Sequence, residues 1–304
     1  MLIIVLENYR KGDLMKRAWS LIETPQQLAR AKKAICASGI IAIDTEYDSF
    51  RYFHEKLCLI QVQTGVNTWL IDPLAGLDLS FLGRVLIDPD VLKILHAGDN
   101  DIRILKRDYA FAFRNIFDTH RAASLLGCRR LSLSTLLEGY LGVTLEKKMQ
   151  RSRWDLRPLS EEQLDYASRD TVHLIDLYRK LDRELNERGL EKEAARLFAE
   201  MIAATWHPKT LDRLGHRKIK GYPTLTAGQK ERLRKLFRWR FEKARETNRA
   251  SFMVLPDQHL VDLSRLDDAS LDALTISGLL SPKKAAHFGA ELLKILRIAV
   301  ISKG

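Results

Sequence analysis

The stretch IIAIDTEYDSF, residues 40–50, decides how the first half of the chain folds. Residues 40–43 form a continuous apolar run typical of a buried strand, and Asp44, Thr45 and Glu46 continue it. Residues two apart in a strand point to the same face, so the carboxylates of Asp44 and Glu46 lie side by side. Such a pair is either an ordinary solvated strand end or, because a divalent cation offsets the repulsion between its charges, part of a metal site.

Flanking segments predict a mixed sheet. Thr24-Pro25 with Gln27 predicts a capped helix that ends at Gly39. Further strands are expected at 57–63, 68–72, 91–95 and 116–117. Short connections make the early strands antiparallel, whereas the later ones alternate with helices and should be parallel. Ser160 and Gln163 form a capping-box pattern that starts a long helix ending near Gly189. We therefore expect an α/β domain with a mixed sheet flanked by helices.

Length and composition leave room for a second domain. The chain has 304 residues, of which 46% are hydrophobic, so a disordered chain is excluded. Prolines, glycines and basic residues fill 206–223, and a helical apolar stripe follows at Leu233, Leu236, Phe237 and Phe241. The predicted organisation is an extension at 1–20, the α/β domain at 21–190, a helical and basic linker at 191–221 and an all-α helical bundle at 222–304.

Positive charge is concentrated in one part of the chain. The formal net charge is +11, and residues 201–250 alone contribute +10. This distribution favours a polyanionic partner, above all nucleic acid, although a solvated linker and helix face would give the same composition. Basic residues predicted to contact phosphates precede the helix at 160 or lie in the charged segment. They are Lys147, Arg151, Arg153, Lys218, Lys220, Lys230, Arg234 and Lys235.

The cysteines and the hydropathy pattern indicate in which cellular compartment the protein is expected. The three cysteines, Cys36, Cys58 and Cys128, are widely spaced and form no C-x-x-C pair, so neither a zinc cluster nor a disulfide framework is expected. The early apolar run at 2–6 is too short for a signal sequence or a membrane span. We expect a cytoplasmic protein without a membrane partner.

Further candidate site residues are informative only when they are considered together. Asp99 and Asp101 both lie in the first turn of a predicted helix, where acidic residues commonly complement the helix dipole, and spacing does not choose between them. Tyr166 and Asp170 share a helix face. Taken singly, each is readily explained as a surface or core-edge residue. Together with Asp44 and Glu46, they could meet at one sheet edge and hold two metal ions ~4 Å apart, as in phosphoester hydrolysis.

Several blocks resemble the ribonuclease D branch of the DEDD exonuclease superfamily. They are IIAIDTEYDSF, KLCLIQVQ at 56–63, LIDPL at 70–74, HAGDNDIRIL at 96–105, FDTHRAASLLG at 117–127 and RSRWDLRPLSEEQLDYASRD at 151–170. The resemblance implies a ribonuclease H-like fold and selects Asp101 rather than Asp99. Tyr166-x-x-x-Asp170 is the tyrosine form of the third motif, because the position where the sister class has His is Asp165.

The later part of the chain is similar to the HRDC helical domain shared by RecQ-type helicases and ribonuclease D. WRFEKARETN at 239–248 carries most of this likeness, and RKIKG at 217–221 resembles the approach to that domain. Ribonuclease D proteins commonly have two such domains, whereas this chain has room for one.

The resemblance implies a 3′-to-5′ exoribonuclease that releases nucleoside 5′-monophosphates from RNA with a free 3′ end, such as a tRNA precursor, without an obligate protein partner. Asp44, Glu46, Asp101 and Asp170 would bind two divalent cations, Mg²⁺ or Mn²⁺, and Tyr166 would orient the attacking water. His96, Trp154 and Cys58 are expected to be structural. A DNA-directed exonuclease, a non-catalytic RNA-binding module and a basic structural protein remain as alternatives.

Overall fold

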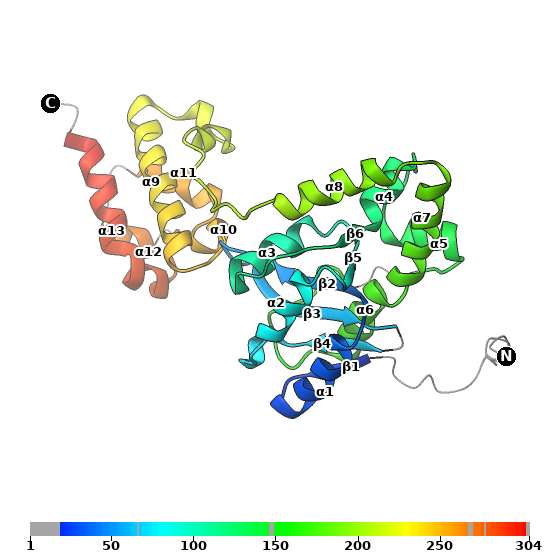
Figure 1. Cartoon of the computed structure of the whole chain (residues 1–304). Coiled ribbons are helices and arrows are strands. Elements are labelled where there is room, and N and C mark those ends of the chain that lie inside the picture. Colours follow the sequence, from blue (N-terminus) through cyan, green and yellow to red (C-terminus); the bar gives the residue numbers. More distant parts are fainter. Residues whose placement is uncertain (1–18, 66, 146–148, 267–269, 277, 302–304) are drawn as a thin grey trace, which may run out of the picture. The chain divides into compact units, whose positions relative to one another are not determined.

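The computed structural model describes residues 19–301 except 66, 146–148, 267–269 and 277. These residues form two compact units (Figure 1). Of the described residues, the first unit comprises 19–48 with Leu57–Trp206, and the second comprises Ser49–Lys56 with 207–301. In the described part of the chain, no helix is both long and apolar enough to cross a membrane.

The first unit is built on a mixed sheet of six strands among the described residues, in the order β1-β4-β3-β2-β5-β6. The strands are β1 (Trp19–Ile22), β2 (Ile40–Asp48), β3 (Lys56–Gln63), β4 (Thr68–Ile71), β5 (Leu92–Leu95) and β6 (Ile116–Asp118). β3 pairs with β4 in antiparallel fashion, whereas β2 with β5, β5 with β6 and β1 with β4 are parallel. The predicted mixed sheet is confirmed, with one additional strand, β1.

Helices flank this sheet, as Figure 1 shows. They are α1 (Pro25–Cys36), α2 (Ser80–Ile87), α3 (Asp99–Tyr109), α4 (Thr119–Leu125), α5 (Leu133–Leu141), α6 (Glu161–Val172), α7 (Leu174–Glu187) and α8 (Glu191–Ala203), with the 3₁₀ turn η1 (Pro73–Ala75). Both capping boxes predicted from the sequence, at Thr24 and Ser160, are formed. The single long helix expected from Ser160 to Gly189 is instead interrupted at His173, which gives α6 and α7.

Two boundaries of the first unit differ from the sequence prediction. β1 begins at Trp19, inside the expected extension, while residues 1–18 lie outside the described residues. α8 lies within the segment predicted as a linker, but it is part of the first unit, because its residues Phe198 and Met201 are buried in the core of that unit. The Lys106 ammonium of α3 also donates to the carbonyls of Ile202 and Ala204 at the end of α8.

The second unit is helical. It contains the 3₁₀ turns η2 (Gly215–Lys218) and η3 (Tyr222–Thr224) and the helices α9 (Ala227–Glu246), α10 (Ser251–Val254), α11 (Asp257–Arg265), α12 (Leu271–Ile276) and α13 (Pro282–Ile301). Leu233, Leu236 and Trp239 of α9 are buried in its core against residues of α11 and α13. The predicted apolar stripe of this helix is therefore its inward face.

The connection between β2 and β3 belongs to the core of the second unit, which the sequence did not predict. Phe53 is 4% exposed, and its ring lies 5.1 Å from that of Phe241 in an edge-to-face arrangement. The backbone N–H of Ala250 donates to the Arg51 carbonyl at 2.9 Å. Segment 49–56 is therefore an integral part of the second unit, although it is inserted in the sequence of the first.

Candidate active site

Three elements of the first unit bring the predicted carboxylates together. β2 places Asp44 and Glu46 on one face near its end. β5 pairs with β2 and leads into α3, whose first turn carries Asp101. The Thr45 hydroxyl donates to the Asp101 carboxylate and thereby ties α3 to β2. α6 packs against β2 and carries Tyr166 and Asp170.

The carboxyl groups of these residues influence one another's pKa. Burial raises the pKa of Asp44 well above its usual range, and the charges of Asp101 and Asp170 raise it further. The pKa of Glu46 is raised in the same way, by burial and then by Asp44 and Asp170. Burial raises the pKa of Asp101 to about 6 and that of Asp170 to about 7. Each carboxylate is thus poorly hydrated, and the charges repel one another.

The donor set suits a hard divalent cation. It consists of carboxylate oxygens, the ligands that Mg²⁺ and Mn²⁺ prefer. None of the described Lys and Arg side chains forms an ion pair with Asp44, Glu46, Asp101 or Asp170, so their negative charge is uncompensated. As the described side chains stand, no three His, Cys, Asp or Glu residues are close enough to enclose an ion. The chemistry of the donors, rather than a preformed cage, supports the assignment.

The structure distinguishes Asp101 from Asp99. The Asp99 carboxylate accepts from the Arg121 guanidinium at 2.7 Å, so its charge is already neutralised. Asp101 is 6% exposed and has no cationic partner among the described residues. The two side chains, which spacing does not separate, thus differ in their partners, and the carboxylate without a cationic partner among the described residues is that of Asp101.

Tyr166 lies beside the carboxylates. Burial, followed by the charges of Asp170, Glu46 and Asp44, raises the pKa of its hydroxyl. A hydroxyl that is neutral at physiological pH can donate or accept a hydrogen bond but is a poor base. The neighbouring Asp165 accepts from the Trp19 indole N–H at 2.6 Å, so the position that holds His in the sister class ties α6 to β1.

A cavity of about 290 Å³ opens onto Asp44, Tyr166 and Asp170. Sequence reasoning missed its other lining residues, which are Ser132, Leu133, Ser134, Leu145 and Gln150, and treated His96 as structural. His96 lines the cavity, and its ring Nδ1 lies 2.9 Å from the Thr119 hydroxyl. Burial, helped by His120, lowers the pKa of His96 to about 4, so the ring is neutral. The sequence signal that could have placed His96 near the site is its position in HAGDND, immediately after a strand and five residues before Asp101.

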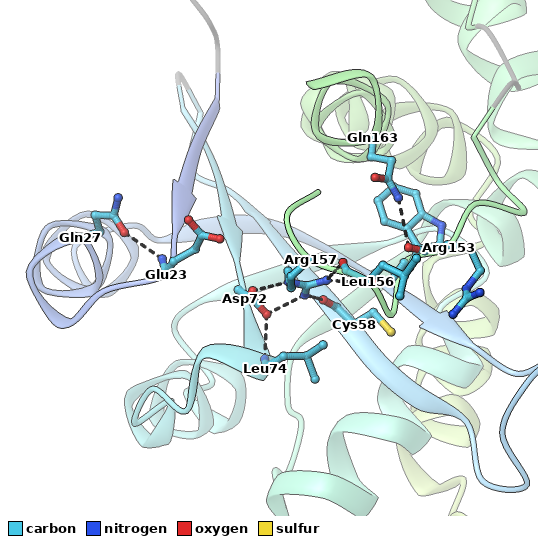
Figure 2. Close-up of polar contacts among 10 residues, drawn as sticks. Glu23, Gln27, Cys58, Asp72, Leu74, Arg153, Leu156, Arg157 and Gln163 are labelled. Atoms are coloured by element: carbon cyan, nitrogen blue, oxygen red, sulfur yellow. Dashed lines mark hydrogen bonds and ion pairs between the residues drawn. The ribbon is translucent and has the colours of Figure 1, made fainter. Parts of the chain in front are cut away.

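Other predicted residues serve local structure. Trp154 is 2% exposed and packs with Cys58 in the cluster beneath α6, as expected. Arg157 donates to Asp72 through two nitrogens, at 2.5 and 2.7 Å, and to the carbonyls of Cys58, Trp154 and Leu156, contacts that Figure 2 shows in part. This arginine anchors the segment that leads into α6.

The predicted phosphate-contacting residues have varied surroundings. In the first unit, Lys147 lies outside the described residues, Arg151 is exposed and Arg153 pairs with Asp155 at 2.8 Å. In the second unit, Lys218 pairs with Asp212, Arg234 and Lys235 with Glu231, and the Lys230 ammonium lies over the Tyr222 ring, whereas Lys220 is exposed. Most of these cations thus already have intramolecular partners.

Gly98→Ala tests how the start of α3 is positioned. A Cβ at this residue would lie 2.8 Å from the Cβ of Leu95, and the Gly98 N–H donates to the buried Asp118 carboxylate at 3.0 Å. We expect a loss of about 1–3 kcal/mol in unfolding free energy and a fall in activity, because the helix carrying Asp101 must shift. Denaturant unfolding measures the first effect.

The control for this substitution is Gly139→Ala in α5, where an added Cβ meets nothing within 4 Å. It should stabilise the helix by about 0.5–1 kcal/mol and leave activity unchanged. If Gly98→Ala keeps the activity and the stability seen with Gly139→Ala, the Leu95 side chain must accommodate the added Cβ without a shift of α3.

Two family models match the chain. The first, described as 3′-5′ exonuclease, matches residues 20–186. The second, described as HRDC domain, matches residues 229–296. The first match contains all five residues of the carboxylate and tyrosine set.

Relatives and solved structures agree with these matches. Ribonuclease D of Escherichia coli is 31% identical over 92% of this chain and 75% of its own length, and its crystal structure superposes with a TM-score of 0.68. Exosome complex component 10 homolog of Drosophila melanogaster is 33% identical over 80% of the chain, which spans only 28% of that protein's length. The catalytic core of RRP6 from Trypanosoma brucei, 23% identical, shares the fold over 96% of this chain and 82% of its own, with a TM-score of 0.86.

Proposed function

The chain belongs to the ribonuclease D family of 3′-5′ exonucleases, and from this premise we propose that it removes nucleoside 5′-monophosphates stepwise from the 3′ end of RNA. The observation that carries the proposal is the set Asp44, Glu46, Asp101 and Asp170, whose charges are poorly hydrated, mutually repulsive and without a cationic partner among the described residues.

In this proposal the four carboxylates hold two divalent cations, Mg²⁺ or Mn²⁺. Such ions, when bound, activate a water nucleophile and stabilise the negative charge on the leaving 3′ oxygen. The protein contributes a site in which burial and mutual repulsion raise the pKa of the carboxyl groups, so that bound positive charge favours their ionised form. Binding the ions therefore releases protons, and the affinity should fall as the pH drops towards 6.

The cavity next to the carboxylates is proposed to receive the terminal nucleotide. Its volume, about 290 Å³, is at the lower end of the range of small-ligand sites. The hydroxyls of Ser132 and Ser134 and the amide of Gln150 offer hydrogen bonds to sugar or base, while Leu133 and Leu145 give an apolar wall. Tyr166 orients the attacking water through its neutral hydroxyl.

Tyr166→Phe should lower kcat about 10²-fold while leaving KM nearly unchanged, because only the orientation of the water is lost. Single-turnover cleavage of a 5′-labelled RNA measures the effect. Tyr178→Phe, which removes the hydroxyl of a ring that packs on Phe117 at 4.8 Å, is the matched control. A variant at Tyr166 that keeps the wild-type rate would remove this residue from the proposed mechanism.

The proposed substrates are structured RNAs, such as tRNA precursors, trimmed in the cytoplasm. The similarity to ribonuclease D of Escherichia coli, an exoribonuclease involved in structured RNA processing, supports RNA rather than DNA. The three cysteines are unbonded, as expected in a reducing compartment. We propose that the chain acts without an obligate protein partner.

The test uses 5′-labelled RNA that ends in a 3′ hydroxyl or a 3′ phosphate, with matched single-stranded DNA, in Mg²⁺ or Mn²⁺. We expect stepwise shortening of the RNA with the free 3′ hydroxyl, little cleavage of the phosphorylated RNA, and inactivity of Asp44→Ala. Equal rates on DNA would favour a general 3′-5′ exonuclease. Undiminished cleavage by the Asp44 variant would overturn the site assignment.

A further inference from the structure

A second cavity lies within the second unit, where the end of α9, α10 and the start of α13 meet (yellow, orange and red in Figure 1). Its volume is about 670 Å³, more than twice that of the cavity at the carboxylates and within the range of ligand sites. Four basic side chains line it, those of Arg249, Lys283, Lys284 and His287.

Two of these cations have no carboxylate partner in the part of the chain that the structure describes. Among the described residues, no carboxylate forms an ion pair with Arg249 or Lys283. Glu291, on the same helix as Lys283, is already engaged by the Lys243 ammonium at 2.9 Å and the Trp239 indole at 2.6 Å. The cavity therefore keeps a net positive potential that an anion would relieve.

Lys284 shapes the cavity wall. Its ammonium donates to the carbonyls of Met253 and Val254, at 3.1 and 2.9 Å, and so fixes the end of α10. Burial lowers the pKa of Lys284, and the nearby positive charge of Arg249 lowers it further. The lining also includes apolar side chains, of which Val254 and Phe288 are buried and Met253 is 38% exposed.

This surface contrasts with the basic residues predicted from the sequence. Lys218, Arg234 and Lys235 pair with carboxylates of the second unit, so a phosphate would have to displace Asp212 or Glu231. Arg249 and Lys283 need no such exchange. Among the basic residues predicted from the sequence, Lys220 and Lys230 also have no carboxylate partner within the described residues, but neither lines this cavity, where cations and apolar side chains occur together.

We propose that this cavity binds one nucleotide of single-stranded RNA, with the phosphate on Arg249 and Lys283 and the base against Met253 and Phe288. This inference rests on the proposed exoribonuclease function and adds a second RNA contact to it. A simple anion would contact the basic side chains but not the apolar ones, so it explains only part of the cavity. Double-stranded RNA is not favoured, because its bases are stacked within the helix and cannot contact the apolar side chains.

The test measures equilibrium binding of labelled single-stranded RNA by fluorescence anisotropy over a range of salt concentrations, in full-length protein that carries Asp44→Ala to prevent cleavage. Arg249→Ala/Lys283→Ala should weaken binding on the order of tenfold and reduce the salt slope by about 0.7, the contribution of one neutralised phosphate on a single strand. Lys32→Ala/Lys33→Ala, which removes two exposed lysines of α1, should have little effect. Arg234→Ala/Lys235→Ala should reduce the affinity for RNA less than Arg249→Ala/Lys283→Ala does.

With Asp44 restored, cleavage of a dinucleotide separates the two proposals. If the wild-type protein cleaves it and the cavity variant cleaves it equally well but degrades long RNA poorly, the inference is supported. If both proteins cleave the dinucleotide and the cavity variant binds RNA as tightly as the wild type, the cavity assignment is overturned. This holds also if Arg249 and Lys283 are then found to bind an acidic peptide. A larger loss in Arg234→Ala/Lys235→Ala would also overturn it. Failure of the wild-type protein to cleave any RNA would instead defeat the proposed function.

Discussion

Asp170→Asn should abolish RNA cleavage and, in the absence of metal, make the protein more stable at neutral pH. The loss of activity, expected to be at least about 10³-fold, follows from removing one of the oxygen ligands that position the reaction. The gain in stability follows because Asn keeps the shape of the side chain but carries no charge. The same substitution thus separates the catalytic role of Asp170 from its energetic effect on folding.

The sign of the pH dependence follows from the raised pKa. Burial raises the pKa of Asp170 from 3.8 to about 7, so the folded state binds a proton more tightly than the unfolded state. Without metal, wild-type stability should therefore fall as the pH rises from about 4 to about 7. A difference of about three pKa units corresponds to roughly 4 kcal/mol, and partial solvation should reduce the measured gain to roughly 2–4 kcal/mol.

Denaturant unfolding in EDTA at pH 4, 6 and 8 tests this expectation. The two proteins should have similar stability at pH 4, and Asp170→Asn should be the more stable at pH 8. Added Mg²⁺ or Mn²⁺ should stabilise only the wild type appreciably. Asp176→Asn is the control, because that exposed carboxylate of α7 pairs with Arg179 in solvent. A variant less stable than wild type at pH 8 would contradict the picture of repelling carboxylates.

Local signals were sufficient to predict much of the first unit. The apolar run of β2, the two capping boxes and the positions of Asp44 and Glu46 depend on residues close in sequence, and the structure agrees with the sheet and helices they predicted. The choice between Asp99 and Asp101 was different. It depends on Arg121, twenty-two residues further along, which spacing within one helix cannot reveal.

Features that depend on distant packing were not predictable. β1 has only four residues, and it is a strand because it pairs with β4, almost fifty residues away. Phe53 lies in the connection between β2 and β3, and its ring is buried against Phe241, which is almost two hundred residues further along the chain. The net charge likewise does not reveal that Arg249 and Lys283 have no carboxylate partner among the described residues, because composition does not say which cations form ion pairs.

Distant packing also decides where α6 begins, and Arg157→Met should show this through a large loss of stability. The guanidinium bridges Asp72, at the end of β4, to the carbonyls of Cys58, Trp154 and Leu156 (Figure 2). Asp72 is only 3% exposed, so removal of Arg157 leaves a buried carboxylate unpaired. Breaking a buried pair in this way costs about 3–5 kcal/mol.

The effect of Arg157→Met should extend to catalysis, because the segment anchored by Arg157 leads directly into the helix carrying Tyr166 and Asp170. At a temperature where the variant is folded, kcat should fall about 10²-fold, the effect of a shift of about 1 Å in a reacting group. Asp72→Asn combined with Arg157→Met should be less destabilising than the sum of the single changes, since no unpaired charge remains. Arg179→Met, which breaks an exposed pair, should cost less than about 1 kcal/mol. Additive losses in the double variant would mean that the carbonyl contacts of Arg157, rather than its bond to Asp72, hold α6 in place.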